Sequence, residues 1–82
     1  MRAWQIITPN AGTKYWLQLN SGAWAWKNAV PTEHWCLCSR FDYMHAGMFE
    51  SGGQQRLSDT RAEELGLEFE AARAAGKLVV IP

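Results

Sequence analysis

The sequence has no excess of charge of either sign, because eight Lys and Arg residues balance eight Asp and Glu residues among its 82 positions. Proteins that bind nucleic acid usually carry a dense cationic patch, and a protein that imitates DNA needs the opposite excess. Neither excess is present, so the overall composition favours neither function. Locally, residues 1–40 carry four basic residues against one acidic residue, a net charge of +3. Residues 58–82 carry three basic against five acidic, a net charge of −2. We therefore expect a weakly basic aromatic side and an acidic helix.

Long hydrophobic runs and cysteine pairs are also missing. No apolar stretch approaches the ~20 residues that a membrane span needs, and the start of the chain, Met1–Trp4, lacks an apolar signal core. The two cysteines, Cys36 and Cys38, are one residue apart, where a disulfide closes a small and strained ring. We therefore expect reduced thiols and a cytoplasmic protein.

Tryptophan, by contrast, is abundant: there are five Trp residues, all within the first 35 positions. The length indicates one domain over residues 1–82, with a thin core. Such a core cannot cover five indole rings. We expect at least one or two of them to be partly exposed, where Trp commonly marks an interface.

Alternating side chains predict a β-hairpin over residues 14–27, after a short strand at residues 4–8. A Gly-containing turn at residues 20–22 separates the two arms. The returning arm places Trp24 and Trp26 on one face, with small Ala residues on the other. A further strand is predicted over residues 34–40, with extensions at 41–44 and 46–49 and a flexible connector at 51–55.

A helix is predicted over residues 59–75. Thr60 and Glu63 have the spacing of a capping box, and Ser58 is the competing N-cap. Gly76 is expected just after the helix, and Gly66 lies where a strand or partner can approach closely. The buried stripe is expected to comprise Ala62, Leu65, Phe69 and Ala72.

The apolar run after the helix predicts a short buried strand over residues 77–81. The fold class is therefore α+β, a small and mostly antiparallel sheet of four or five short strands, with one C-terminal helix packed on one face and this final short strand. An exposed sheet edge, at residues 4–8 or at the hairpin, would allow two copies to form a homodimer.

Two thiols and two imidazoles raise the hypothesis of a zinc site. His34, Cys36 and Cys38 share one face of a strand, and His45 follows seven residues later. The spacing matches no common zinc knuckle, and free Cys more often behaves as a small core residue. A Cys–His nucleophilic pair would need a cleft and an oxyanion donor, which no motif indicates. We expect no cofactor, no catalytic residue and no metal ligand.

The tryptophans allow two interpretations. Trp24 and Trp26 could form the core against the helix, which the small Ala23 and Ala25 on the other face favour. They could instead form an exposed patch beside Lys14 and Lys27 that binds a protein or stacks the bases of single-stranded nucleic acid.

The leading hypothesis is a small non-enzymatic protein-binding domain, an inhibitor or adaptor of a larger complex. Phage proteins that block a host defence complex, such as CRISPR inhibitors, are examples of that class. We expect the aromatic anchors and an acidic rim to be the partner-binding residues: Trp16, Trp24, Trp26, Trp35, Glu63, Glu64 and Glu68. A nucleic-acid-binding module and a zinc-binding domain are the alternatives.

Overall fold

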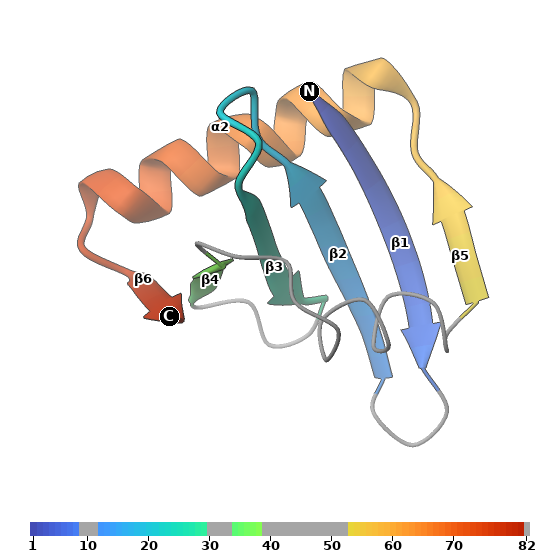
Figure 1. The fold of residues 1–82 in the computed structure, drawn as a ribbon, viewed down its shortest axis with the longest axis horizontal. Helices are drawn as coiled ribbons and strands as arrows, with labels where there is room; N and C mark the ends of the chain where they lie inside the picture. Colours follow the sequence, from blue (N-terminus) through green and yellow to red (C-terminus); the bar gives the residue numbers. More distant parts are fainter. Residues whose placement is uncertain (9–11, 30–33, 39–52, 82) are drawn as a thin grey trace.

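The computed structural model describes residues 1–8, 12–29, 34–38 and 53–81 (Figure 1). In these residues a six-stranded sheet carries one helix across one face, which confirms the predicted α+β fold. The sheet order is β5-β1-β2-β3-β4-β6; β4 and β6 are parallel and the other neighbours are antiparallel. The elements are β1 (Arg2–Thr8), β2 (Gly12–Gln18), β3 (Trp24–Asn28), β4 (Trp35–Cys38), β5 (Gly53–Arg56), α2 (Asp59–Ala74) and β6 (Leu78–Ile81).

The predicted hairpin is confirmed as β2 and β3, with Trp16 paired to Trp26. Its turn is closed by a hydrogen bond that the Leu19 amide donates to the Ala23 carbonyl, at 2.8 Å. Gly22 has a φ of 92°, a conformation that costs glycine little and other residues much more. The turn thus fixes the register that places the two Trp residues side by side.

The flexible connector expected at residues 51–55 is partly wrong. Residues 53–55 belong to β5, which pairs with β1 along its length, while 51–52 lie outside the described residues. The sequence missed this strand because its four residues are polar or Gly, and backbone hydrogen bonds rather than side-chain burial hold it. The strand extensions expected at residues 39–40, 41–44 and 46–49 also lie outside the described residues.

Both ends of helix α2 have identifiable caps. The N-cap is Ser58, whose Oγ accepts a hydrogen bond from the Arg61 amide at 3.2 Å, so the predicted Thr60 cap is wrong and the competing one is right. At the other end the Lys77 amide donates to the Ala72 carbonyl, and Gly76 adopts a φ of 73°. The Gly76 amide also donates to the Arg73 carbonyl, at 3.1 Å. These two hydrogen bonds form a Schellman motif, which turns the chain directly toward β6. Within the described residues, no helix has the length and apolar character that a membrane span requires.

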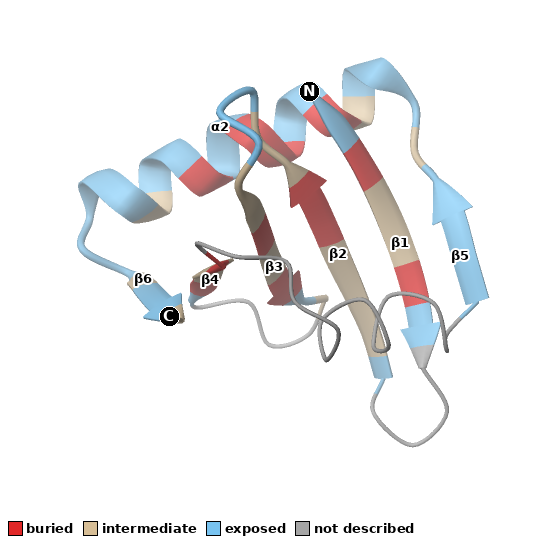
Figure 2. Cartoon of the chain, in the orientation of Figure 1, coloured by how far each residue is buried: buried red, intermediate tan, exposed pale blue. Residues whose placement is uncertain are grey.

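The main core lies between α2 and the sheet. Leu65 and Phe69 of the helix pack with Ala3 and Ala25 of the strands, and all four residues are buried. Figure 2 shows the buried parts of α2, β1, β2 and β3 in red. The Phe69 ring meets Trp35 edge to face, with ring centroids 5.7 Å apart. Because the helix supplies the large side chains, the strands below it carry small ones, and the two layers approach closely. The predicted stripe is confirmed, with Ala72 partly buried at its end.

Gly66 is where the first strand approaches the helix. A Cβ at this position would lie 2.8 Å from Met1 Sδ. The absence of a side chain therefore lets the start of β1 pack against the helix, as the sequence suggested.

The sequence led us to expect that the final strand is buried, and this prediction is wrong. β6 is the outer strand of the sheet beyond β4, and Val79 and Val80 are 46% and 62% exposed. Likewise, residues 4–8 and the hairpin are interior strands, so the dimerisation edges expected there are wrong. The edges of the described sheet are β5 and β6.

The caps lead to a first prediction. Ser58→Ala removes the acceptor of an otherwise unsatisfied helix amide and should lower the free energy of unfolding by about 1 kcal/mol. Thr60→Ala should change it by less than about 0.5 kcal/mol, because Thr60 is not the cap. Urea unfolding followed by circular dichroism measures both. A larger loss for Thr60→Ala than for Ser58→Ala would contradict the assigned helix start.

Candidate protein-binding surfaces

Four tryptophans gather on the sheet face opposite the helix. Cross-strand pairing aligns Trp4 with Trp16 and Trp16 with Trp26. Trp24, two residues before Trp26 on β3, is the diagonal neighbour of Trp16. Ring centroids are 5.2 Å apart for Trp4–Trp24, 6.1 Å for Trp16–Trp24 and 6.0 Å for Trp16–Trp26. These spacings are those of directly packed aromatic rings. We call this group, Trp4, Trp16, Trp24 and Trp26, the tryptophan face.

The tryptophan face has a buried centre and a partly exposed border. Trp16 is completely buried, as are Ile6 and Cys38 on the same side of the sheet. Trp4, Trp24 and Trp26 are only partly buried, which confirms that some indole rings reach the surface. The centre therefore acts as a second apolar core, and the three outer rings offer contact area held in place by packing.

The small alanines of β3 favoured the interpretation that Trp24 and Trp26 form the core against the helix. This interpretation is wrong. Ala25 belongs to the core beneath α2, so strand alternation puts both Trp residues on the other face. The error has a physical cause. Small residues mark the strand face that a helix approaches closely, because the helix brings the bulk.

Basic side chains surround the tryptophan face. Arg2, Lys14 and Arg56 project to the same side of the sheet, as the pairing of Arg56 with Trp4 requires. The Lys14 ammonium lies 5.1 Å from the centre of the Trp26 ring and donates to Asn28 Oδ1 at 2.9 Å. None of the described strands contains an acidic residue, so the described part of this face is aromatic and positive.

The predicted partner-binding residues do not form one surface. Trp16, Trp24 and Trp26 lie on the tryptophan face, whereas Trp35 is buried beneath the helix. The three glutamates are exposed along α2 and do not border the tryptophan face; they are Glu63, Glu64 and Glu68. Trp4 was missed, although its ring packs on Trp24, because this pairing depends on the β1–β2 register, which a local sequence pattern does not show.

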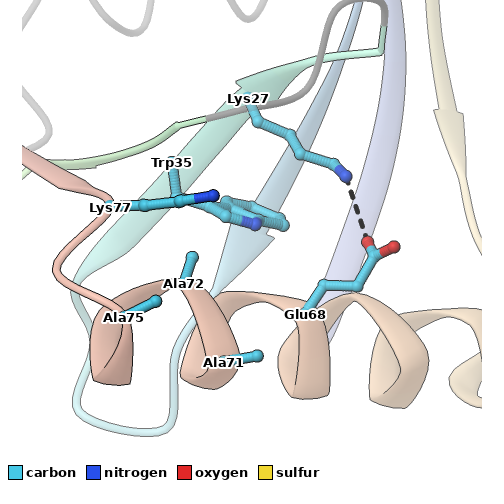
Figure 3. Close-up of a pocket in the computed structure, with 7 residues that line it drawn as sticks. All are labelled: Lys27, Trp35, Glu68, Ala71, Ala72, Ala75 and Lys77. Carbon is cyan, nitrogen blue, oxygen red and sulfur yellow. Dashed lines mark hydrogen bonds and ion pairs between the residues drawn. The ribbon is translucent and has the colours of Figure 1, made fainter.

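A pocket of about 380 Å³ opens between the second half of α2 and the sheet (Figure 3). Lys27 lies at its inner side and is almost completely buried, with its ammonium 3.1 Å from Glu68 Oε2. The same ammonium lies 5.3 Å from the Trp35 ring centre and 5.9 Å from that of Tyr15. The carboxylate and both rings compensate the loss of hydration that burial imposes on this charge. Lys77 and alanines of the helix complete the pocket.

The thiols and the imidazoles give little support to metal or nucleophilic chemistry. His34 is exposed, Cys36 is half-buried and Cys38 is buried, while His45 lies outside the described residues. Burial raises the pKa of the Cys36 thiol, against an opposing effect of the Lys14 ammonium, so the thiol stays protonated at neutral pH. The described ranges contain no cluster of three or more His, Cys, Asp or Glu that would hold a metal.

Comparisons with known proteins do not add a function: no protein-family model matches the chain, and no curated protein or solved structure is significantly similar to it.

The buried ion pair leads to a second prediction. Glu68→Ala leaves the Lys27 ammonium without its carboxylate and should destabilise the fold by about 1–3 kcal/mol, less than for a fully buried pair because Glu68 is half exposed. Lys27→Met keeps the side-chain volume and removes the charge, so it should change stability by less than about 1 kcal/mol in either direction.

Urea unfolding of both variants and of the double variant measures these effects. In the double variant, the loss caused by Glu68→Ala should largely disappear. A loss as large for Lys27→Met as for Glu68→Ala would mean that the pair itself stabilises the fold.

Proposed function

We propose that this protein is a small non-enzymatic protein-binding domain that uses the tryptophan face to bind an acidic surface of a larger complex. One observation carries the proposal: partly exposed Trp4, Trp24 and Trp26 surround a buried Trp16, with three cations beside them and no carboxylate on the described strands. Trp and Arg are the residues most often found as energetic anchors of protein interfaces.

The packing of these rings favours their use as anchors. Each outer ring contacts at least one other ring of the tryptophan face, so its orientation is fixed before a partner arrives. Binding then costs little side-chain entropy, which favours affinity at a small interface. The strands that carry these rings, β1, β2 and β3, are all interior strands of the sheet.

The biological role in this proposal is that of an inhibitor or adaptor that acts in the cytoplasm by covering a surface of its target. Cys36 and Cys38 are not joined by a disulfide, which fits a reducing compartment. Phage proteins that block a host defence complex, CRISPR inhibitors among them, work in this way and serve as the model for the role. The cations beside the tryptophan face would steer it toward an acidic target.

The third prediction tests the tryptophan face. Arg2→Glu with Arg56→Glu reverses two exposed charges without touching the core, and Trp24→Ala removes a half-buried anchor. Each should weaken binding to the partner by about 2 kcal/mol, roughly thirtyfold. Tagged protein is used to capture partners from its native host cells, with nuclease added. Affinities for the captured partner are then measured by biolayer interferometry.

Leu67→Ala is the matched control, because Leu67 is a large exposed apolar residue on the outer side of α2. It should bind like the wild type. Near-ultraviolet circular dichroism confirms that each variant is folded. A partner that binds all folded variants of the tryptophan face with wild-type affinity would contradict the proposed site.

Nucleic acid is the second candidate ligand of the same face, and the Lys14–Trp26 contact favours it, because single-stranded binding sites combine cations with stacked rings. Three cations that contact phosphates predict a log–log salt slope of about −2 for single strands. Our account instead predicts no measurable binding of an oligothymidine of about 20 nucleotides at low salt, where such contacts are strongest. Fluorescence anisotropy decides between the two. Binding with a log–log salt slope of about −2 would mean that the ligand of the tryptophan face is a nucleic acid and not a protein.

A further inference from the structure

Strand β6 is an apolar strand at the edge of the sheet. It contains Leu78, Val79, Val80 and Ile81, and no strand in the described part of the chain pairs with its outer side. Val79 is exposed on one face of the sheet and Val80 on the other. Natural sheets usually protect such an edge with charges, proline or a bulge, because an unprotected edge recruits further strands.

The opposite edge of the same sheet is protected. β5 consists of Gly53, Gln54, Gln55 and Arg56, all of which are exposed. Its polar side chains offer no apolar surface to an added strand. The contrast between the two edges shows that the apolar character of β6 is not a general property of this sheet.

The geometry of β6 leaves a defined set of backbone groups for a new strand. The Trp35 amide donates to the Lys77 carbonyl, which fixes how β6 pairs with β4. In a parallel ladder alternate residues bond to the same neighbour, so Val79 and Ile81 face β4, whereas Leu78 and Val80 face outward. The amides and carbonyls of Leu78 and Val80 are therefore the groups that an added strand would bond.

The positive charge of Lys77, just before β6, indicates that the added strand carries an acidic residue. Lys77 is exposed, and its ammonium has no ion-pair partner among the described residues. It lines the pocket that also holds Lys27 and Glu68, so the lining carries two ammonium groups and one carboxylate (Figure 3). A second carboxylate would balance this charge.

A second copy of the chain fits this edge less well. Its β6 contains no carboxylate to pair with Lys77. An acidic segment of another protein satisfies both the backbone groups and the charge.

We propose that β6 binds an extended apolar segment of a partner protein by strand addition, with an acidic residue of that segment paired to Lys77. Backbone hydrogen bonds to Leu78 and Val80 hold the segment, and its apolar side chains cover Val79 and Val80. This surface is separate from the tryptophan face, so either proposal can fail without the other.

The test uses two labelled peptides, Glu-Val-Thr-Val-Thr-Val-Glu and the same peptide with Lys at both ends. Because acidic residues stand at both ends, either strand direction brings one of them to Lys77. Titrations are followed by fluorescence polarisation and by amide chemical shifts of the protein. We expect the acidic peptide to bind about three- to tenfold more tightly than the basic one. The largest shifts should fall on Leu78 and Val80.

Three variants locate the binding. Val80→Pro removes an outward amide at an edge position where proline is tolerated, and it should abolish binding. Lys77→Glu should reverse the preference between the peptides, and this exchange decides the matter even if Val80→Pro does not fold. Leu67→Lys on the helix should leave binding unchanged, as should Trp24→Ala on the tryptophan face.

Three results would overturn the proposal. The first is no saturable binding of either peptide, and the second is equal binding of both. The third is a dimer in sedimentation velocity that Val80→Pro dissociates, since a second copy would then occupy the edge.

Discussion

Helix α2 approaches the sheet closely where the strands carry alanine, and the rest of the structure depends on this contact. Ala3 and Ala25 lie completely buried under Leu65 and Phe69. Since side chains alternate along a strand, alanine beneath the helix forces the neighbouring tryptophans of β1 and β3 to the opposite face. The close approach at Gly66, where Met1 takes the place of a side chain, extends the same arrangement to the start of the first strand. One packing requirement thus produces both the core and the tryptophan face.

The elements that the sequence predicts well are those whose evidence is local. The hairpin is encoded by alternation and a Gly22 turn, and the helix by Ser58, its apolar stripe and Gly76, all of which act within a few residues. The features that the sequence did not predict depend on contacts with strands that are distant along the chain. β5 exists because β1 offers hydrogen-bonding groups, and β6 is an edge because of the sheet order. Of the predicted partner-binding residues, three tryptophans lie together on the tryptophan face. Trp35 lies in the core beneath the helix, and the glutamates lie on α2. That Trp4 belongs to the tryptophan face follows only from the register between β1 and β2.

The fold separates charge as well as aromatic residues. All the described carboxylates lie on α2, whereas the face across the sheet holds Arg2, Lys14 and Arg56. Four described cations lie on the helix side instead: Arg61 and Arg73 on α2, Lys77 just after it, and Lys27, which is buried where Glu68 reaches over to pair with it. Among the described residues, the helix side thus carries five carboxylates and four cations, whereas the face across the sheet carries three cations and no carboxylate. A domain polarised in this way presents a defined orientation to a charged partner without a large net charge.

The central claim is that the tryptophan face, and not the acidic helix, contacts the partner. Hydroxyl-radical footprinting of the protein, free and bound to its captured partner, tests this directly, because indole rings react readily when they are accessible. The account predicts that Trp4, Trp24 and Trp26 become protected on binding, while Leu67 on the outer side of α2 reacts as before. Protection of Leu67 and its helical neighbours, with the three tryptophans unchanged, would contradict it.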